Sequence, residues 1–127
     1  MNAWGRTQPL SMVTILVMLV TVAMVGNADA QTSEEGFANF YSDKFEGKKT
    51  ASGEVYEKNG LTAAHKKLPF GTKVKVTNVA TGKSIVVTVN DRMAATNTAV
   101  IDVTRRAAEE LGFVKAGKAK VKLEVQK

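Results

Sequence analysis

Apolar and polar residues alternate along the middle of the chain. Between Lys73 and Val79, Val74 and Val76 fall on one face of a strand and polar side chains fall on the other. A turn at residues 80–82 follows, and after it comes the β-branched run from Ser84 to Val89. Two such runs joined by a short turn with glycine predict a β-hairpin.

Two later segments also have the pattern of strands. The run from Ala99 to Val103 is apolar and rich in β-branched residues. The segment from Lys120 to Gln126 alternates strictly, with Val121, Leu123 and Val125 on the buried side. Several short strands in a chain of this length predict an all-β domain closed into a small barrel, because closure leaves no exposed strand edge.

One helix is predicted near the C-terminal end. Thr104 is a good N-cap, residues 105–111 carry apolar side chains at helical spacing, and Gly112 stands where a left-handed residue ends a helix. We expect this helix to cover one side of the barrel. The segment from Thr62 to Lys67 is ambiguous, because its helix propensity is confined to a stretch too short to nucleate alone and Pro69 ends it.

The first thirty residues have the pattern of a signal peptide. Arg6 supplies a positive charge, residues 12–25 form an apolar run, and residues 28–30 are Ala-Asp-Ala, which offers small residues to signal peptidase. The apolar run is about fourteen residues long, short of the roughly twenty that a helix needs to cross a bilayer. We therefore expect export and cleavage after residue 30, with a retained N-terminal anchor as the alternative.

The rest of the chain is expected to form one domain. Residues 31–35 are polar and lack periodicity, which predicts a short disordered tail before a domain at residues 36–127. The chain has no cysteine, so disulfides and a lipid anchor on a cysteine thiol are excluded. We expect a monomer that is periplasmic or secreted and has no stable insertion in the membrane.

The charge of the chain restricts its partners. Eighteen Lys and Arg against 12 Asp and Glu give a net charge of +6, which favours anionic polymers or surfaces. Nucleic acid is disfavoured, because the basic residues are scattered through the strand-like segments and no recognition helix with an aromatic stacking set is present. Cell-wall glycans and anionic lipids remain, as does the simpler interpretation that the lysines form a solvated face of a sheet.

Few residues can carry chemistry in this chain. The absence of cysteine and the single histidine exclude a cysteine nucleophile and argue against a zinc site. No Gly-rich phosphate loop and no G-x-S-x-G elbow is present. Polar residues stand where the local pattern does not require them at Glu54, His65 and Asp91, the last followed by Arg92.

These residue types suit the cleavage of a glycosidic bond, which needs an acid for the leaving oxygen and a base or anion near the anomeric carbon. Simpler roles stay open for each of them. Glu54 fits a solvated turn, His65 a structural histidine, and Asp91 with Arg92 an ion pair in a loop. Asp102 is interpreted as a capping or buried hydrogen-bonding carboxylate rather than a catalyst.

Five blocks of sequence, in order along the chain, carry a resemblance to a known family. They are G-x-A-x-x-Y at 36–41, F-x-G-x-x-T-A-S-G-E at 45–54, L-T-A-A-H-K-x-L-P-F-G-T at 61–72, V-N-D-R at 89–92, and I-D-V-T with A-A-x-x-L-G between 101 and 112. Together they resemble the rare lipoprotein A family of septal-ring lytic transglycosylases. The resemblance implies a six-stranded double-psi β-barrel with one or two short helices.

The resemblance also implies an activity on peptidoglycan glycan strands. Family members cleave the bond between N-acetylmuramic acid and N-acetylglucosamine without water and leave a 1,6-anhydro end, with no metal or organic cofactor. By position in the motifs, Asp91 is expected to act as general acid and then base, and Glu54 and His65 to tune it or hold substrate. Four further motif residues are expected to bind substrate, namely Tyr41, Ser52, Asn90 and Arg92.

The sequence also departs from the family pattern. The loop from Met93 to Val100 is altered, Asn39 replaces a common serine, and Phe40 replaces a frequent tryptophan. A lipid-anchor cysteine and a C-terminal glycan-binding repeat domain are missing, which predicts a free single domain. An expansin-like module that binds and loosens the wall without cleavage is therefore an alternative, and hydrolysis to a reducing end is a third.

Overall fold

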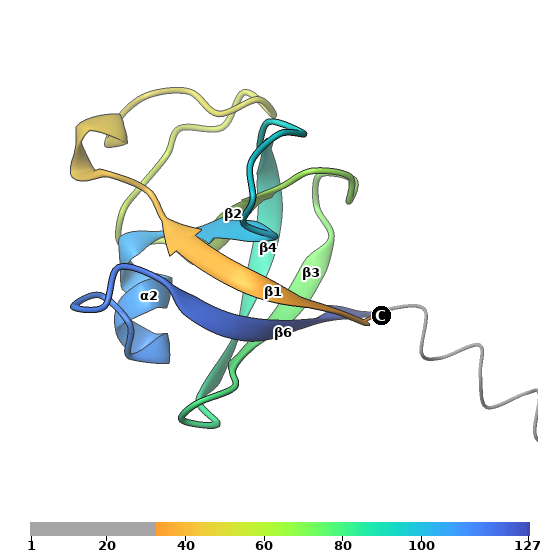
Figure 1. Ribbon diagram of the computed structural model, residues 1–127. Coiled ribbons are helices and arrows are strands. Elements are labelled where there is room, and N and C mark those ends of the chain that lie inside the picture. The colour runs from red at the N-terminus through yellow and green to blue at the C-terminus, as the bar shows by residue number, and fades with distance from the viewer. Residues whose placement is uncertain (1–32) are drawn as a thin grey trace, which may run out of the picture. The chain divides into compact units, whose positions relative to one another are not determined.

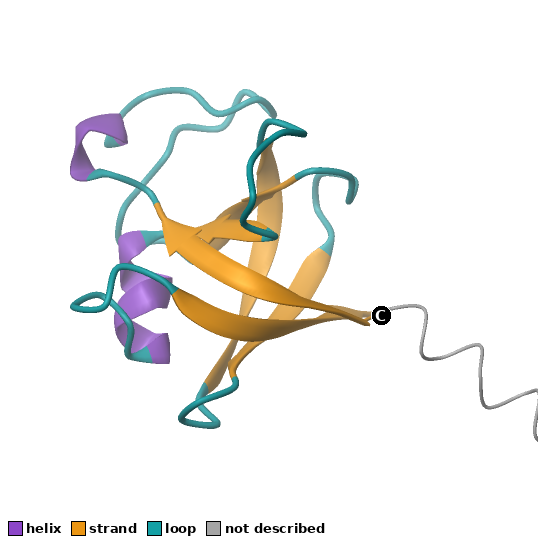
Figure 2. Ribbon diagram, viewed as in Figure 1, coloured by secondary structure: helices purple, strands orange, loops and turns teal. Residues whose placement is uncertain are grey.

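The computed structural model describes residues 33–127, in which six strands close into a barrel (Figure 1; Figure 2). The strands are β1 (Ser33–Phe40), β2 (Thr62–His65), β3 (Lys73–Asn78), β4 (Ser84–Arg92), β5 (Ile101–Val103) and β6 (Ala119–Gln126). No helix in this range is long and apolar enough to span a membrane. The predicted signal peptide, residues 1–30, lies outside the described residues and stays a prediction.

The strands follow the order β1-β5-β2-β4-β3-β6 around the barrel. Two pairs, β1 with β5 and β2 with β4, are parallel, and the other four are antiparallel. The predicted hairpin is β3 and β4, in which Val74 faces Val87 and Val76 faces Ile85. The predicted small all-β barrel is thus confirmed, and its parallel pairs join strands that lie far apart along the chain.

The core consists of the inward-facing side chains of all six strands. They are small or β-branched for the most part, as the narrow interior requires: Ala38, Ala63, Val74, Val76, Val87, Val89, Ile101, Val103, Val121 and Leu123. The predicted helix is α2 (Arg105–Leu111), which lies against one side of the barrel (Figure 1). Its buried residues, Ala107, Ala108 and Leu111, complete the core.

Both predicted ends of α2 are confirmed. The Thr104 hydroxyl oxygen accepts a hydrogen bond from the Ala107 N–H, which satisfies one of the free donors at the helix start. Gly112 has φ +80°, and its N–H reaches back to the carbonyls of the last turn. The second short helix is the 3₁₀ helix η2 (Asp43–Phe45).

Two segments differ from their sequence-based expectations. Residues 33–35 are the start of β1 and not a disordered tail, because their backbone pairs with residues 122–124 of β6. Backbone hydrogen bonds between strands form whatever the side chains are, so the polar side chains of residues 33–35 did not indicate a strand. The ambiguous segment at 62–67 is a strand from Thr62 to His65, since β4 and β5 supply hydrogen-bonding partners on both sides.

Gly36 of β1 lies against Val100 in the loop between β4 and β5. A Cβ at this position would stand 2.4 Å from Cγ1 of Val100. We therefore expect Gly36→Ala to lower the free energy of unfolding by about 1–3 kcal/mol, the usual cost of overpacking. In a Val100→Ala background most of that cost should disappear, as measured by urea titration. An equal cost in both backgrounds would show that the steric explanation is wrong.

Candidate functional site

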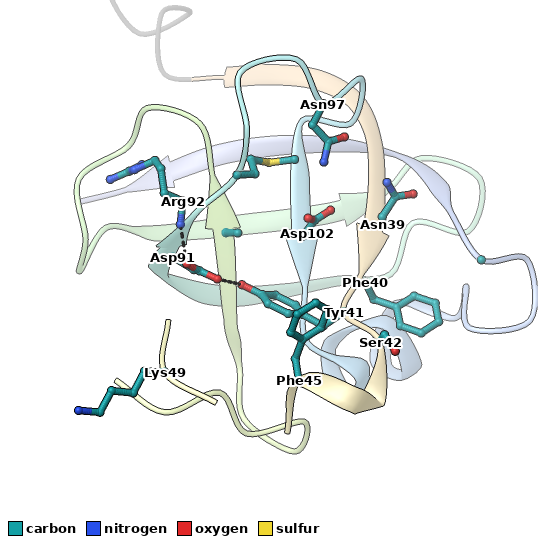
Figure 3. Close-up of a pocket in the computed structure, with 13 residues that line it drawn as sticks. Asn39, Phe40, Tyr41, Ser42, Phe45, Lys49, Asp91, Arg92, Asn97 and Asp102 are labelled. Atoms are coloured by element: carbon teal, nitrogen blue, oxygen red, sulfur yellow. Dashed lines mark hydrogen bonds between the residues drawn. The ribbon is translucent and has the colours of Figure 1, made fainter. Parts of the chain in front are cut away.

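Four neighbouring residues from four strands form a row across the outside of the barrel. Asn39 of β1 pairs with Asp102 of β5, Asp102 pairs with Ala64 of β2, and Ala64 pairs with Asp91 of β4. All four line an open pocket of about 580 Å³ (Figure 3). The two aspartates therefore stand two strand spacings apart, about 10 Å between Cα atoms, with only the small Ala64 between them.

Loops on both sides of this row build the walls of the pocket. One wall belongs to the segment after β1 and includes Phe45 and Lys49, and the other belongs to the loop between β4 and β5 with Met93 and Asn97. Both segments lie at the same end of the barrel (Figure 1). The altered loop from Met93 to Val100 therefore forms part of the pocket. On the opposite wall, Phe45 contributes a partly exposed aromatic ring.

A β-bulge turns the Asp91 side chain into the pocket. Between β2 and β4 the register shifts, so that Ala63 faces Val89 while Ala64 faces Asp91, and Asn90 is the extra residue. Bulges of this kind re-aim a side chain next to a site. The chain at residues 51–52 docks on the bulge, because the Ser52 N–H donates to the Asn90 carbonyl.

Asp91 is held by three hydrogen-bond donors. Its Oδ2 accepts from the Tyr41 hydroxyl at 2.6 Å, and its Oδ1 accepts from the backbone N–H groups of Ala51 and Arg92, both at 2.8 Å. Donors on both oxygens fix the orientation of the carboxylate. Asp91 is thus held in one orientation in the wall of the pocket.

Asp102 has the opposite environment. Its Oδ1 atom is buried and has no hydrogen-bond partner among the described residues. Burial raises the pKa of Asp102 above its ordinary value of 3.8, and the negative charge of Asp91 raises it further. The expectation that Asp102 caps the helix or makes a buried hydrogen bond is wrong for this atom, because Thr104 is the cap and the carboxylate faces the pocket.

The raised pKa of Asp102 makes the stability of the fold depend on pH. Between 3.8 and the raised value the folded chain keeps a proton that the unfolded chain releases, so stability falls as pH rises through this window. Asp102→Asn removes the titration. As pH rises above 3.8, we expect the melting temperature of the variant to increase relative to that of the wild type. A difference in melting temperature that does not change with pH would contradict this.

Tyr41 connects Asp91 to an aromatic cluster. Its ring stacks on Tyr56 with centroids 4.4 Å apart and meets Phe45 edge-on at 6.1 Å. Burial raises the pKa of the Tyr41 hydroxyl far above its usual range, and the hydrogen bond to Asp91 and its charge raise it further. The hydroxyl therefore stays protonated well above neutral pH and can donate to Asp91 there.

Glu54 lies outside the pocket that holds Asp91. Its Oε1 accepts a hydrogen bond from the Asn90 side-chain amide at 3.0 Å. Glu54 and Asn90 together line two other, smaller pockets. Asn90 is nearly buried, and its Oδ1 has no hydrogen-bond partner among residues 33–127. Ser52 is engaged within its own turn, where its hydroxyl contacts Thr50 and the Glu54 N–H.

His65 also points away from the Asp91 pocket. Its side chain is 7 % exposed, and its Nε2 atom lies 3.0 Å from Oε1 of Glu34. Arg92 does line the pocket; its Nη1 donates to the backbone carbonyls of His65 and Leu68, and its guanidinium stacks on Phe70. The structure thus separates the three predicted catalytic residues and leaves only one of them, the aspartate, in this pocket.

Sequence reasoning did not identify the second pocket carboxylate. Asp102, set aside as structural, reaches the pocket only because β5 and β2 are paired in a particular register, and no local pattern reports that register. Phe45 and Lys49 were not predicted either, although both lie within the block at 45–54 that carries the family resemblance. Within the described residues, no group of three or more His, Cys, Asp or Glu side chains could hold a metal ion.

Comparison with known proteins identifies the family. A family model described as lytic transglycolase matches residues 33–123. The chain belongs to the lytic transglycolase family. The resemblance to lytic transglycosylases and the double-psi β-barrel that it implied are confirmed.

Named relatives of this lytic transglycolase domain agree. The endolytic peptidoglycan transglycosylase RlpA of Rickettsia bellii is 50 % identical over 101 residues, which cover 77 % of this chain and 44 % of the relative. The protein of the same name from Neisseria meningitidis is 47 % identical over 98 residues, which cover 77 % and 41 %. The chain spans less than half the length of these two relatives.

Solved structures share the fold of this lytic transglycolase domain at low sequence identity. A Streptomyces papain inhibitor has a TM-score of 0.60 and 19 % identity, with 75 % of this chain and 94 % of that chain covered. A Clavibacter michiganensis expansin in complex with cellohexaose has a TM-score of 0.58 and 19 % identity, with 75 % and 50 % covered. These likenesses establish the barrel alone.

Proposed function

We propose that this domain is a lytic transglycosylase that cleaves the bond between N-acetylmuramic acid and N-acetylglucosamine in peptidoglycan glycan strands. The observation that carries the proposal is the pair of aspartates in one open pocket, Asp91 and Asp102, whose environments differ. The family and the names of the relatives support the same activity and substrate. The domain acts after export, as a monomer and without stable membrane insertion.

The two carboxyls divide the acid and base roles. Burial and the neighbouring charge keep a proton on Asp102 to higher pH, so it donates that proton to the glycosidic oxygen as the bond to the muramic C1 breaks. Asp91, oriented by its three donors, accepts the proton of the muramic 6-hydroxyl as that oxygen attacks C1. Exchange with solvent then restores both starting forms.

This division refines the sequence-based expectation that Asp91 acts alone as acid and then base. A single residue in both roles needs an environment that accommodates both protonation states. The donors around Asp91 leave its two oxygens as acceptors, whereas burial and the charge of Asp91 raise the pKa of Asp102 and make Asp102 the better proton donor. The Cα spacing of about 10 Å leaves room between the side chains for a sugar carbon and its attacking hydroxyl.

Removal of one hydroxyl group tests the support given to Asp91. Tyr41→Phe deletes the 2.6 Å hydrogen bond and keeps the stacking on Tyr56, so we expect kcat to fall roughly 10-fold, with a small change in melting temperature. Tyr56→Phe is the matched control, since among the described residues its hydroxyl accepts only from the Arg105 N–H. Equal activity losses in the two variants would remove Tyr41 from the mechanism.

The competing function is an expansin-like module that binds and loosens the wall without breaking bonds. Purified insoluble peptidoglycan distinguishes the two by pull-down and by release of soluble fragments. The proposal predicts binding and soluble fragments from the wild type, and binding without fragments from Asp91→Asn. Binding by both proteins with no fragments from either would establish the loosening module instead.

A further inference from the structure

Both nitrogens of the single histidine are already engaged within the fold. The Nδ1 atom of His65 accepts hydrogen bonds from the backbone N–H groups of Lys67 at 3.0 Å and Leu68 at 3.1 Å. Because Nδ1 accepts, the proton of the neutral ring is on Nε2, which donates to Glu34. The ring has no free nitrogen to offer a substrate and does not line the Asp91 pocket.

The turn at residues 66–68, whose N–H groups donate to His65, also lies against the side chain of Arg92. Nη1 of Arg92 donates to the His65 carbonyl at 3.0 Å and to the Leu68 carbonyl at 2.7 Å, one at each end of the turn. The guanidinium also lies 4.5 Å from the ring centre of Phe70, just beyond the turn. Within residues 33–127, Nε and Nη2 of Arg92 make no hydrogen bond, and the side chain points away from Asp102, Asn97 and Asn39 across the pocket (Figure 3).

We propose that His65 is a positioning residue: as a hydrogen-bond acceptor it shapes the turn at 66–68. The carbonyls of His65 and Leu68, on either side of this turn, hold the side chain of Arg92 in place. His65 neither gives nor takes a proton in the reaction. Arg92 directly follows Asp91, and its backbone N–H donates to the Asp91 carboxylate. A change in the turn that displaces Arg92 therefore also displaces a donor to Asp91. The effect on catalysis rests on the proposed function.

The deciding variant is His65→Asn. Asparagine side chains readily accept a hydrogen bond from the backbone N–H two residues later, yet they cannot transfer a proton near neutral pH. We expect His65→Asn to keep activity within a few-fold of the wild type, while His65→Ala loses on the order of 10-fold in kcat/KM. If His65→Asn is folded and as inactive as His65→Ala, the imidazole takes part in the chemistry and the proposal is wrong.

Two further variants test the route of the effect. In an Arg92→Met background, His65→Ala should cause little additional loss of kcat/KM, because the residue that it positions is gone. Glu34→Gln should leave activity unchanged, since its amide oxygen still accepts from Nε2. A strong loss in Glu34→Gln would instead indicate a proton-transferring carboxylate–histidine pair, and full additivity with Arg92→Met would place the action of His65 elsewhere.

Hydrogen exchange separates this inference from the proposed function. The Lys67 and Leu68 amides should exchange slowly in the wild type and in His65→Asn, and faster in His65→Ala, whether or not the protein cleaves glycan. A wild type that releases no product would overturn the proposed function alone. Unchanged exchange at both amides in a folded His65→Ala variant would overturn the positioning role.

Discussion

Asp91→Asn is expected to abolish measurable release of soluble fragments from peptidoglycan, with kcat lower on the order of 10²–10⁴-fold. The amide has the shape of the carboxylate, and its oxygen can still accept from the Ala51 and Arg92 N–H groups, so the fold should persist. What it lacks is the ability to take a proton from the muramic 6-hydroxyl. Initial rates on purified glycan strands measure the loss.

The matched control for Asp91→Asn is the same substitution at Asp43. This aspartate is exposed on η2, and within residues 33–127 its carboxylate contacts only the Arg105 guanidinium, at 3.5 Å. Exposed pairs of this kind contribute little, so Asp43→Asn should retain wild-type rates. Activity of Asp91→Asn within threefold of this control would remove Asp91 from the chemistry.

Asp102→Asn is expected to lower kcat by a similar order, about 10²–10⁴-fold, because the leaving oxygen then receives no proton from the pocket. In the wild type the protonated form is the active one. Burial raises the pKa of Asp102, so activity should hold to higher pH than an ordinary carboxyl allows and then fall as the proton is lost. The residual activity of the variant should lack this alkaline limb.

A pH–rate profile of the wild type and Asp102→Asn checks both parts of this prediction. Loss of rate with an unchanged alkaline limb would assign the proton donor to another group. A variant with a wild-type rate would return Asp102 to the structural role first expected of it, and Asp91 alone would then have to serve as acid and base.

The features that depend on local pattern were predictable from the sequence. The β3–β4 hairpin follows from alternation before a glycine turn and a β-branched run after it, and α2 follows from Thr104, its apolar spacing and Gly112. Asp91 was found because it follows the buried-looking run that ends at Val89, where the local pattern does not require a polar residue. The extended start of β1 was missed, since its pairing with β6 depends on backbone groups and not on side chains.

The composition of the pocket was less predictable, because it depends on register between distant strands. Asp91 and Asp102 share the pocket because both pair with Ala64 of β2. The pairing of β2 with β4 is parallel and contains a bulge, and the pairing of β2 with β5 is antiparallel and joins strands of four and three residues. Glu54 and His65 occur in the same motifs as the pocket residues, yet the chain directs them into an adjoining hollow and toward Glu34. Proximity within a motif did not imply a shared pocket.

The central claim is that the pocket of Asp91 and Asp102 cleaves glycan strands by internal attack rather than by water. Mass spectrometry of the products from purified glycan strands tests this most directly, because a 1,6-anhydro end is lighter than a reducing end by one water. The account predicts anhydro ends from the wild type and none from Asp91→Asn. Reducing ends would contradict internal attack, and no new ends from the folded wild type would contradict cleavage altogether.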